Sequence, residues 1–227
     1  ELRRLTDAAL RAVAPDGAVL RHLHLDGGKL TLIDEYGAPA WSGRLDAYRR
    51  IRVLGAGKGA APMAAALENL LGDRISDGLV IVKYGHDLPE GQRTRHIRIK
   101  EGGHPVPDEA GAAAAGEIVD MARDSREDDL VLCTFTGGAS ALTPALHPEI
   151  PLADMQRLTC MLLECGATIH EINTLSNGGK VASGILTTGC SLGGMQAANF
   201  FFRRPDLFVG CISLSGGFNR RIFYGDY

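Results

Sequence analysis

Three times along this sequence, a short apolar segment runs into a glycine-rich turn that opens a helix-like stretch. The three turns are Gly55-Ala56-Gly57-Lys58-Gly59, Thr136-Gly137-Gly138-Ala139-Ser140 and Gly189-Cys190-Ser191-Leu192-Gly193. Nearly continuous apolar segments are typical of strands buried on both faces. Strands that alternate with helices form parallel sheets covered by helices. The pattern therefore predicts a three-layer α/β fold with a mostly parallel sheet, and it places the turns at the carboxyl ends of strands, where ligands bind.

The other elements are predicted from apolar periodicity and from turn residues. Residues 2–14 carry apolar side chains at helical spacing and predict an N-terminal helix that ends at Pro15. Residues 19–25 alternate and are joined by Asp26-Gly27-Gly28 to residues 29–34, which predicts a β-hairpin. Further strands are expected at 51–54, 78–83, 96–100, 129–134, 185–188 and 209–214, and helices at 60–71, 108–123 and 152–165.

The histidines and cysteines give no pattern typical of a metal site. His22 and His24 would share one face of the first hairpin strand, but no third ligand is near them in the sequence, so hydrogen-bonded or solvated imidazoles are favoured. The five cysteines are odd in number and form no C-x-x-C pair. They are expected to be reduced thiols of a cytoplasmic protein, and no residue is assigned to a metal.

Charge and hydropathy exclude two classes of partner. Lys plus Arg number 24 and Asp plus Glu number 27, so the net charge is −3. This balance argues against a nucleic-acid-binding arm or a membrane-surface patch. The apolar runs are also far shorter than the ~20 residues that a membrane-spanning helix needs. We therefore expect a small-molecule substrate, without nucleic acid or membrane as a partner.

The first two glycine turns are candidate phosphate sites. After a strand, Gly55 and Gly57 would let the backbone approach an anion, and Lys58 adds a mobile cation. The turn is neither a Walker A loop nor a complete G-x-G-x-x-G, because position 60 is Ala. The alternative to an anion site is that the glycines of this turn serve only tight packing between strand and helix. The second turn adds the Ser140 hydroxyl, and two such turns in one sheet favour a single site for a phosphorylated ligand.

The segment Glu101-Gly102-Gly103-His104-Pro105-Val106-Pro107-Asp108 is a further candidate. Its two glycines and two prolines predict a rigid, irregular loop that carries acidic and imidazole side chains. One interpretation is a connector in which Asp108 caps the next helix. The other is a substrate-binding loop that uses Glu101 and His104.

Four motifs in order give the sequence a family resemblance. GAGK at 55–58, EGGHPVPDE at 101–109, TGGASAL at 136–142 and LLECGATIHEIN at 162–173 resemble the type-2 glycerate 2-kinases. The resemblance implies a Rossmann-like N-terminal domain over residues 1–180, the cofactors ATP and Mg²⁺, and phosphoryl transfer to glycerate. It places Lys58 at the reaction centre. It also implies that Gly55, Gly57, Gly137, Gly138 and Ser140 contact the nucleotide, and that Glu101, His104 and Asn173 contact the substrate.

The resemblance changes after Asn173. The family's basic segment V-R-K-H-L-S is missing there, and nothing resembles the family's second domain. Residues 184–227 are instead similar to esterases of the α/β-hydrolase fold, with Ser191 as nucleophile and the Leu192 N–H in the oxyanion hole. A tight strand–helix turn with no catalytic role is the alternative. Residues 181–227 are expected to form a strand-elbow-helix-strand unit that completes the same sheet. No histidine follows Ser191, so the usual order Ser, Asp/Glu, His cannot be formed.

The predicted function is therefore that of a glycerate 2-kinase-like phosphotransferase domain, truncated and impaired in turnover. One alternative is a carboxylesterase that acts on an ester through Ser191. Another is a chimeric scaffold that has no turnover.

Overall fold

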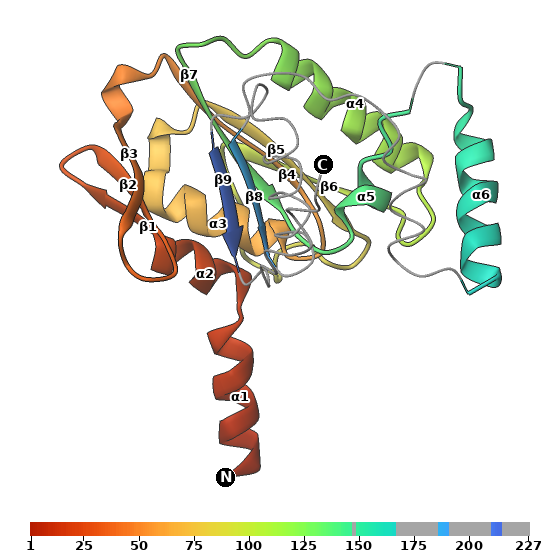
Figure 1. Ribbon diagram of the computed structural model, residues 1–227, viewed down its shortest axis with the longest axis horizontal. Coiled ribbons are helices and arrows are strands. Elements are labelled where there is room, and N and C mark those ends of the chain that lie inside the picture. The colour runs from red at the N-terminus through yellow and green to blue at the C-terminus, as the bar shows by residue number, and fades with distance from the viewer. Residues whose placement is uncertain (147–148, 167–185, 191–209, 215–227) are drawn as a thin grey trace, which may run out of the picture.

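A computed structural model of the chain describes residues 1–146, 149–166, 186–190 and 210–214. Its centre is one parallel sheet with the strand order β6-β5-β4-β7-β8-β9 (Figure 1). The strands are β4 (Arg50–Ala56), β5 (Asp77–Lys83), β6 (Ile97–Gly102), β7 (Asp129–Phe135), β8 (Leu186–Cys190) and β9 (Gly210–Leu214). The six strand predictions are confirmed within one or two residues at most ends, and so is the α/β class.

Alternation along the strands divides the core between two helical layers. Helix α3 (Ala60–Leu71) packs in one cluster with residues that include Val53, Val80 and Leu132. The next residues along the strands face the other way, toward α4 (Glu109–Arg123). There, Ile81 packs in a cluster with Ala114 and Ala115 of α4, and Cys133 in one with Ile118. Figure 1 shows α3 and α4 on opposite sides of the sheet, so the architecture has the predicted three layers.

The N-terminal region differs from its prediction. Helix α1 (Leu2–Ala12) ends before Pro15 as expected, but a second helix, α2 (Pro15–His22), begins there. Proline is favoured in the first turn of a helix because its fixed φ suits the helix and its missing N–H is not needed. The prediction that residues 19–22 form a strand is therefore wrong. His22 and His24 do not share a strand face, because His22 ends α2.

A small antiparallel sheet follows α2. The expected hairpin is present as β1 (Leu23–Asp26) and β2 (Lys29–Ile33), and β3 (Pro39–Arg44) adds a strand that the sequence pattern did not predict. The two imidazoles make hydrogen bonds to backbone carbonyls, His22 Nδ1 at 3.0 Å from Ile33 O and His24 Nε2 at 3.1 Å from Arg21 O. These bonds agree with the structural interpretation of both histidines.

Helices α1 and α6 (Leu152–Glu164) lie at the periphery. Figure 1 shows α1 extending from the body with the N-terminus at its tip, and α6 at one margin beyond the short helix α5 (Ala139–Leu142). No residue of α1 is buried. Within the described part of the chain, no helix combines the length and hydropathy needed to cross a bilayer.

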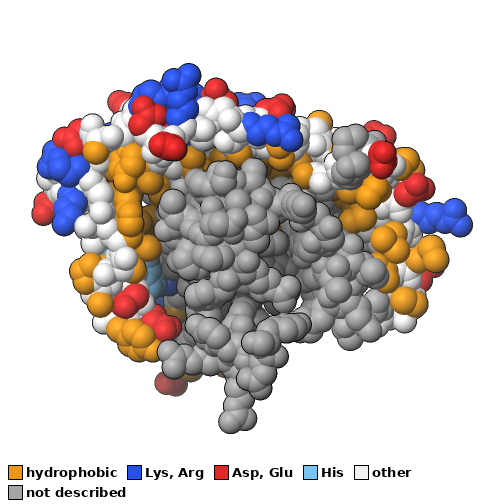
Figure 2. Space-filling model, turned by 45° about the horizontal axis from the view of Figure 1, so that its top comes forward, with side chains coloured by type: hydrophobic (Ala, Val, Ile, Leu, Met, Phe, Trp, Pro, Cys, Tyr) orange, Lys and Arg blue, Asp and Glu red, His pale blue; other side chains and the backbone are white. Residues whose placement is uncertain are grey.

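Charge is mixed on the face that Figure 2 draws, and the described cysteines are free thiols. On the face drawn in Figure 2, basic and acidic side chains are interspersed along the margin, in keeping with the small net charge. Cys133, Cys160 and Cys165 are free. Burial raises the pKa of the Cys133 thiol to about 12, so it stays protonated and unreactive near neutral pH.

Candidate functional site

The first two glycine turns lie side by side at the carboxyl ends of β4 and β7, which are neighbours in the sheet. The Lys58 N–H donates to Gly137 O at 3.1 Å, and the Gly59 N–H donates to Thr136 Oγ1 at 3.0 Å. The two turns are therefore hydrogen-bonded to each other. Their predicted adjacency is confirmed, whereas anion binding stays a prediction.

The glycines of the first turn are required by packing. A Cβ on Gly55 would lie 2.1 Å from Thr134 O, and a Cβ on Gly57 would lie 2.1 Å from Thr136 Oγ1. Gly57 also has a φ of +125°, which side-chain-bearing residues rarely adopt. Because the Gly57, Lys58 and Gly59 N–H groups already donate to acceptors of the protein, only the Lys58 side chain of this turn remains available to an anion.

The loop that carries His104 meets the second turn. Gly138 has a φ of +94°, and a Cβ on it would lie 2.9 Å from His104 Nε2 and 3.6 Å from Lys58 Cε. The His104 ring and the Lys58 side chain thus both reach Gly138. Three segments that are distant in the sequence converge at this point.

Burial is the main cause that lowers the pKa of His104, and the positive charges of Lys58 and Lys83 lower it further. Both causes favour the neutral imidazole. Lys83 is the last residue of β5 and was not predicted as a site residue. Its position at the carboxyl end of a predicted parallel strand is the sequence signal that could have identified Lys83 as a candidate site residue.

Asp108 and Glu101 organise the loop. Asp108 caps α4 by accepting the Gly111 N–H at 2.8 Å, as predicted, and it also accepts the Tyr84 hydroxyl at 2.7 Å. Burial opposes ionisation of Asp108, but hydrogen bonds that include the Gly111 N–H outweigh it and lower the pKa. Glu101 Oε1 accepts the Gly85 N–H at 2.7 Å. Glu101 thus has a structural role in holding the backbone at Gly85, and its predicted contact with a substrate stays a prediction.

The second turn is the more accessible of the two. Among the described residues, no atom lies within 4 Å of where a Cβ on Gly137 would be. The N–H groups of Gly137 and Gly138 have no acceptor in the described part of the chain. Ser140 lies half-buried in the first turn of α5. The arrangement therefore leaves backbone donors and open space next to the Lys58 side chain.

Comparisons with known proteins place the chain in a family. Residues 1–184 match the family described as "Domain of unknown function (DUF4147)". The chain belongs to this family. It is 33% identical over 195 residues to the glycerate 2-kinase of Pyrococcus horikoshii, which covers 83% of this chain and 41% of that protein.

Two solved structures resemble the fold of this DUF4147 chain. A crystal structure of a Pyrococcus horikoshii protein superposes with a TM-score of 0.67 at 30% identity, over 82% of this chain and 42% of that one. The crystal structure of a Thermotoga maritima glycerate kinase gives 0.61 at 27% identity, with the same coverage. The chain thus spans about two fifths of these relatives. The similarities confirm the resemblance to glycerate 2-kinases in the N-terminal part.

Two of the predicted site residues fall in parts of the chain that the structure does not describe. Asn173 and Ser191 lie outside the described residues, and the DUF4147 match ends at residue 184, before Ser191. Strands β8 and β9 extend the central sheet, but the division into a unit 1–180 and an esterase-like unit 181–227 stays a prediction.

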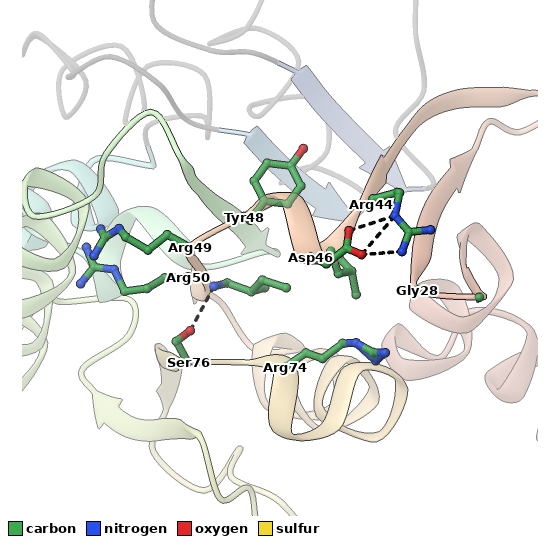
Figure 3. A pocket seen from close by; sticks show the side chains of 11 residues that line it. Gly28, Arg44, Asp46, Tyr48, Arg49, Arg50, Arg74 and Ser76 are labelled. Atoms are coloured by element: carbon green, nitrogen blue, oxygen red, sulfur yellow. Dashed lines mark hydrogen bonds and ion pairs between the residues drawn. The ribbon is translucent and has the colours of Figure 1, made fainter.

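A separate cavity of about 300 Å³ lies at the opposite, amino end of the sheet in this DUF4147 chain (Figure 3). Its lining includes Arg44, Arg49, Arg50 and Arg74. The first three are paired with carboxylates, Arg44 with Asp46 and the other two with Asp129. Because most of its cationic charge is neutralised by the protein, this cavity is a poorer anion site than the carboxyl edge.

Proposed function

We propose that this chain is the N-terminal, nucleotide-binding unit of a glycerate-kinase-type phosphotransferase. The observation that carries the proposal is the convergence of Lys58, the Gly137–Ser140 turn and His104 at the carboxyl edge of a parallel sheet. This edge is where doubly wound folds bind ligands. The similarity to named glycerate kinases supports phosphoryl transfer to a small hydroxy acid as the reaction class.

The residues at this edge suit the phosphates of ATP. The Lys58 ammonium would neutralise phosphate charge, and the Gly137 and Gly138 N–H groups would donate to phosphate oxygens. Bound ATP supplies the phosphoryl group. The task of the protein is to hold the reactants in line and to stabilise the developing negative charge, which is how phosphoryl transfer is generally catalysed.

Mg²⁺ has no ligand set in the described part of the chain. No group of three or more His, Cys, Asp or Glu side chains is gathered there in a way that could hold a metal ion. We therefore assign Mg²⁺ to no residue.

Turnover by the 227-residue chain alone is expected to be absent or very weak. The basic segment that the glycerate kinase resemblance implies after Asn173 is missing from the sequence. The loss of one cation that stabilises the transition state can reduce phosphoryl transfer ~10³-fold or more. Rapid ATP-dependent phosphorylation of glycerate by the pure chain would contradict this expectation.

ATP binding, measured by isothermal titration calorimetry with and without Mg²⁺, tests the proposed site directly. Wild type is expected to bind ATP, and Lys58→Met is expected to weaken binding ~10-fold or more, because one charge-assisted contact is lost. Lys29→Met, the same change at an exposed lysine of β2, is the matched control and should leave the affinity unchanged. Absence of ATP binding, or equal affinity in Lys58→Met, would overturn the proposal.

A further inference from the structure

Lys58 follows β4 and Lys83 ends the neighbouring strand β5, and the positive charges of both act on His104. We propose that Lys83 and His104 form an anionic-oxygen subsite that takes the carboxylate of the small hydroxy acid, beside the phosphate site at Lys58. This assignment rests on the proposed function and names the part of the site that binds the second substrate. Lys83 is the residue that it adds.

Strand pairing places the three residues at neighbouring strand ends. Lys83 pairs with Gly102 across β5 and β6, two residues before His104. The Gly57 N–H donates to Ile81 O at 2.9 Å and ties the turn that carries Lys58 to β5. His104 and Lys58 both reach Gly138. The subsite is therefore assembled from the carboxyl ends of three adjacent strands, β4, β5 and β6. The charges of both Lys58 and Lys83 act on His104.

No ion pair among the described residues neutralises the lysine charges at this place. Within the described residues, neither Lys58 nor Lys83 forms an ion pair. Two carboxylates of the segment 101–108 are engaged by other groups, Glu101 by the Gly85 N–H and Asp108 by the Gly111 N–H and the Tyr84 hydroxyl. Two ammonium groups that have no ion-pair partner in the described part of the chain favour an anion between or beside them.

The position of the subsite favours a carboxylate over a nucleotide phosphate. The open glycine turn at Gly137 and the Lys58 side chain lie at the ends of β7 and β4, whereas Lys83 lies one strand farther, on β5. An acid held there would be next to the phosphate site without occupying it. The neutral His104 ring can accept a hydrogen bond from the hydroxyl of that acid, since one ring nitrogen keeps its lone pair.

The first test measures the affinities of sodium glycerate, inorganic phosphate and ATP by calorimetry. Lys83→Met is expected to weaken glycerate binding ~10-fold or more and to change the ATP affinity less than ~3-fold. Lys83→Arg keeps the charge and should retain part of the glycerate affinity. Lys29→Met is the control for the loss of a lysine charge, and circular dichroism with thermal melting verifies that each variant is folded.

The second test follows the imidazole signals by NMR. Glycerate bound beside His104 should raise the pKa of this imidazole, because an adjacent anion favours the protonated ring. The charges of Lys58, Lys83 and His86 act in the opposite direction and lower this pKa. His22, which is hydrogen-bonded to Ile33 O in the N-terminal region, is the internal reference and should not shift. If Lys83 has only a structural role, folded Lys83→Met should keep the glycerate-dependent rise in the pKa of His104, whereas loss of a carboxylate-binding lysine should reduce or abolish it.

The outcomes separate this inference from the proposed function. If ATP binds and depends on Lys58, but glycerate binds equally to wild type and Lys83→Met or does not bind at all, the subsite is refuted and the nucleotide site stands. If Lys83→Met weakens ATP or phosphate instead of glycerate, Lys83 belongs to the phosphate site and the carboxylate assignment is wrong. If neither ATP nor glycerate binds to wild type, both proposals fail.

Discussion

The two ends of the parallel sheet use cationic side chains in opposite ways. At the amino edge, Arg50 lies 2.9 Å from Asp129 and 2.8 Å from Asp124, and Arg52 lies 2.8 Å from Asp77. At the carboxyl edge, Lys58 and Lys83 have no ion-pair partner among the described residues. The amino edge thus uses charge to hold elements together, whereas the two lysines of the carboxyl edge are the cations that the proposed ligands would contact.

Residue type follows the same division. Arginine forms several fixed hydrogen bonds at once, and Arg52 contacts Asp77, Asp124 and the Met121 carbonyl while it is only 5% exposed. Lysine is a compact charge on a flexible chain that can follow a ligand. At the carboxyl edge, the glycine turns let the backbone lie close to the Lys58 side chain. The arginine contacts of the amino edge need no such turn.

Among the variants that distinguish the two edges, substitution of Gly57 is expected to change the free energy of unfolding most. In Gly57→Ala, the new Cβ would lie 2.1 Å from Thr136 Oγ1 at a φ of +125°. Overpacking together with an unfavourable backbone should cost about 3 kcal/mol or more in the free energy of unfolding, measured by urea denaturation. Gly116→Ala, in the exposed face of α4 where nothing lies within 4 Å, is the control and should stabilise by ~0.5–1 kcal/mol. Wild-type stability of Gly57→Ala would refute the close contact of the two turns.

Removal of Arg52 should break the amino edge. Arg52→Met is expected to lower the free energy of unfolding by about 2 kcal/mol, because several hydrogen bonds to charged groups are lost while the partly exposed carboxylates of Asp77 and Asp124 regain water. Arg44→Met removes an exposed ion pair with Asp46 and should leave the stability nearly unchanged. ATP affinity should be the same in both variants, and an effect of Arg52→Met on ATP binding would contradict the division of roles between the edges.

Acid should weaken the amino edge. Burial would raise the pKa of Asp129, but hydrogen bonds from Arg50 and the Arg126 N–H outweigh it and lower the pKa from 3.8 to about 2. A carboxylate whose pKa is depressed by folding contributes stability above its unfolded pKa, and this contribution is lost as the pH falls through the folded value. The stability difference between wild type and Asp129→Asn should therefore be largest at neutral pH and shrink between about pH 4 and pH 2. A pH-independent difference would show that the charge of Asp129 is not the cause.

Apolar periodicity predicted the parallel sheet and the turns because strand, turn and helix are each local in the sequence. It missed α2, since the alternating residues 19–22 resemble a strand while Pro15 starts a helix. It also missed β3, whose register is set by pairing with β2. Turn chemistry identified Lys58, and the loop motif identified His104.

The partners of charged side chains were not predictable in the same way. Arg50 and Asp129 are 79 residues apart and meet only because β4 lies next to β7. Lys83 joins the site for the same kind of reason, because β5 lies between β4 and β6. Strand order comes from the packing of the whole domain, so a local pattern can place a residue at a strand end without showing what lies beside it.

Gly137→Ala is expected to have the smallest effect on stability, and it therefore separates ligand binding at the carboxyl edge from folding most clearly. No described atom lies within 4 Å of the position its Cβ would take, and its φ is not in the left-handed region, so the free energy of unfolding should change by less than ~0.5 kcal/mol. ATP affinity, measured by calorimetry, should nevertheless fall ~3-fold or more, because the added methyl group stands where the phosphates would approach the backbone. Gly138→Ala is a poor substitute, since its Cβ would meet the His104 ring at 2.9 Å and disturb folding and binding together. Unchanged ATP affinity in a fully stable Gly137→Ala would mean that the phosphates do not approach this turn, and that the open space beside Lys58 serves another ligand.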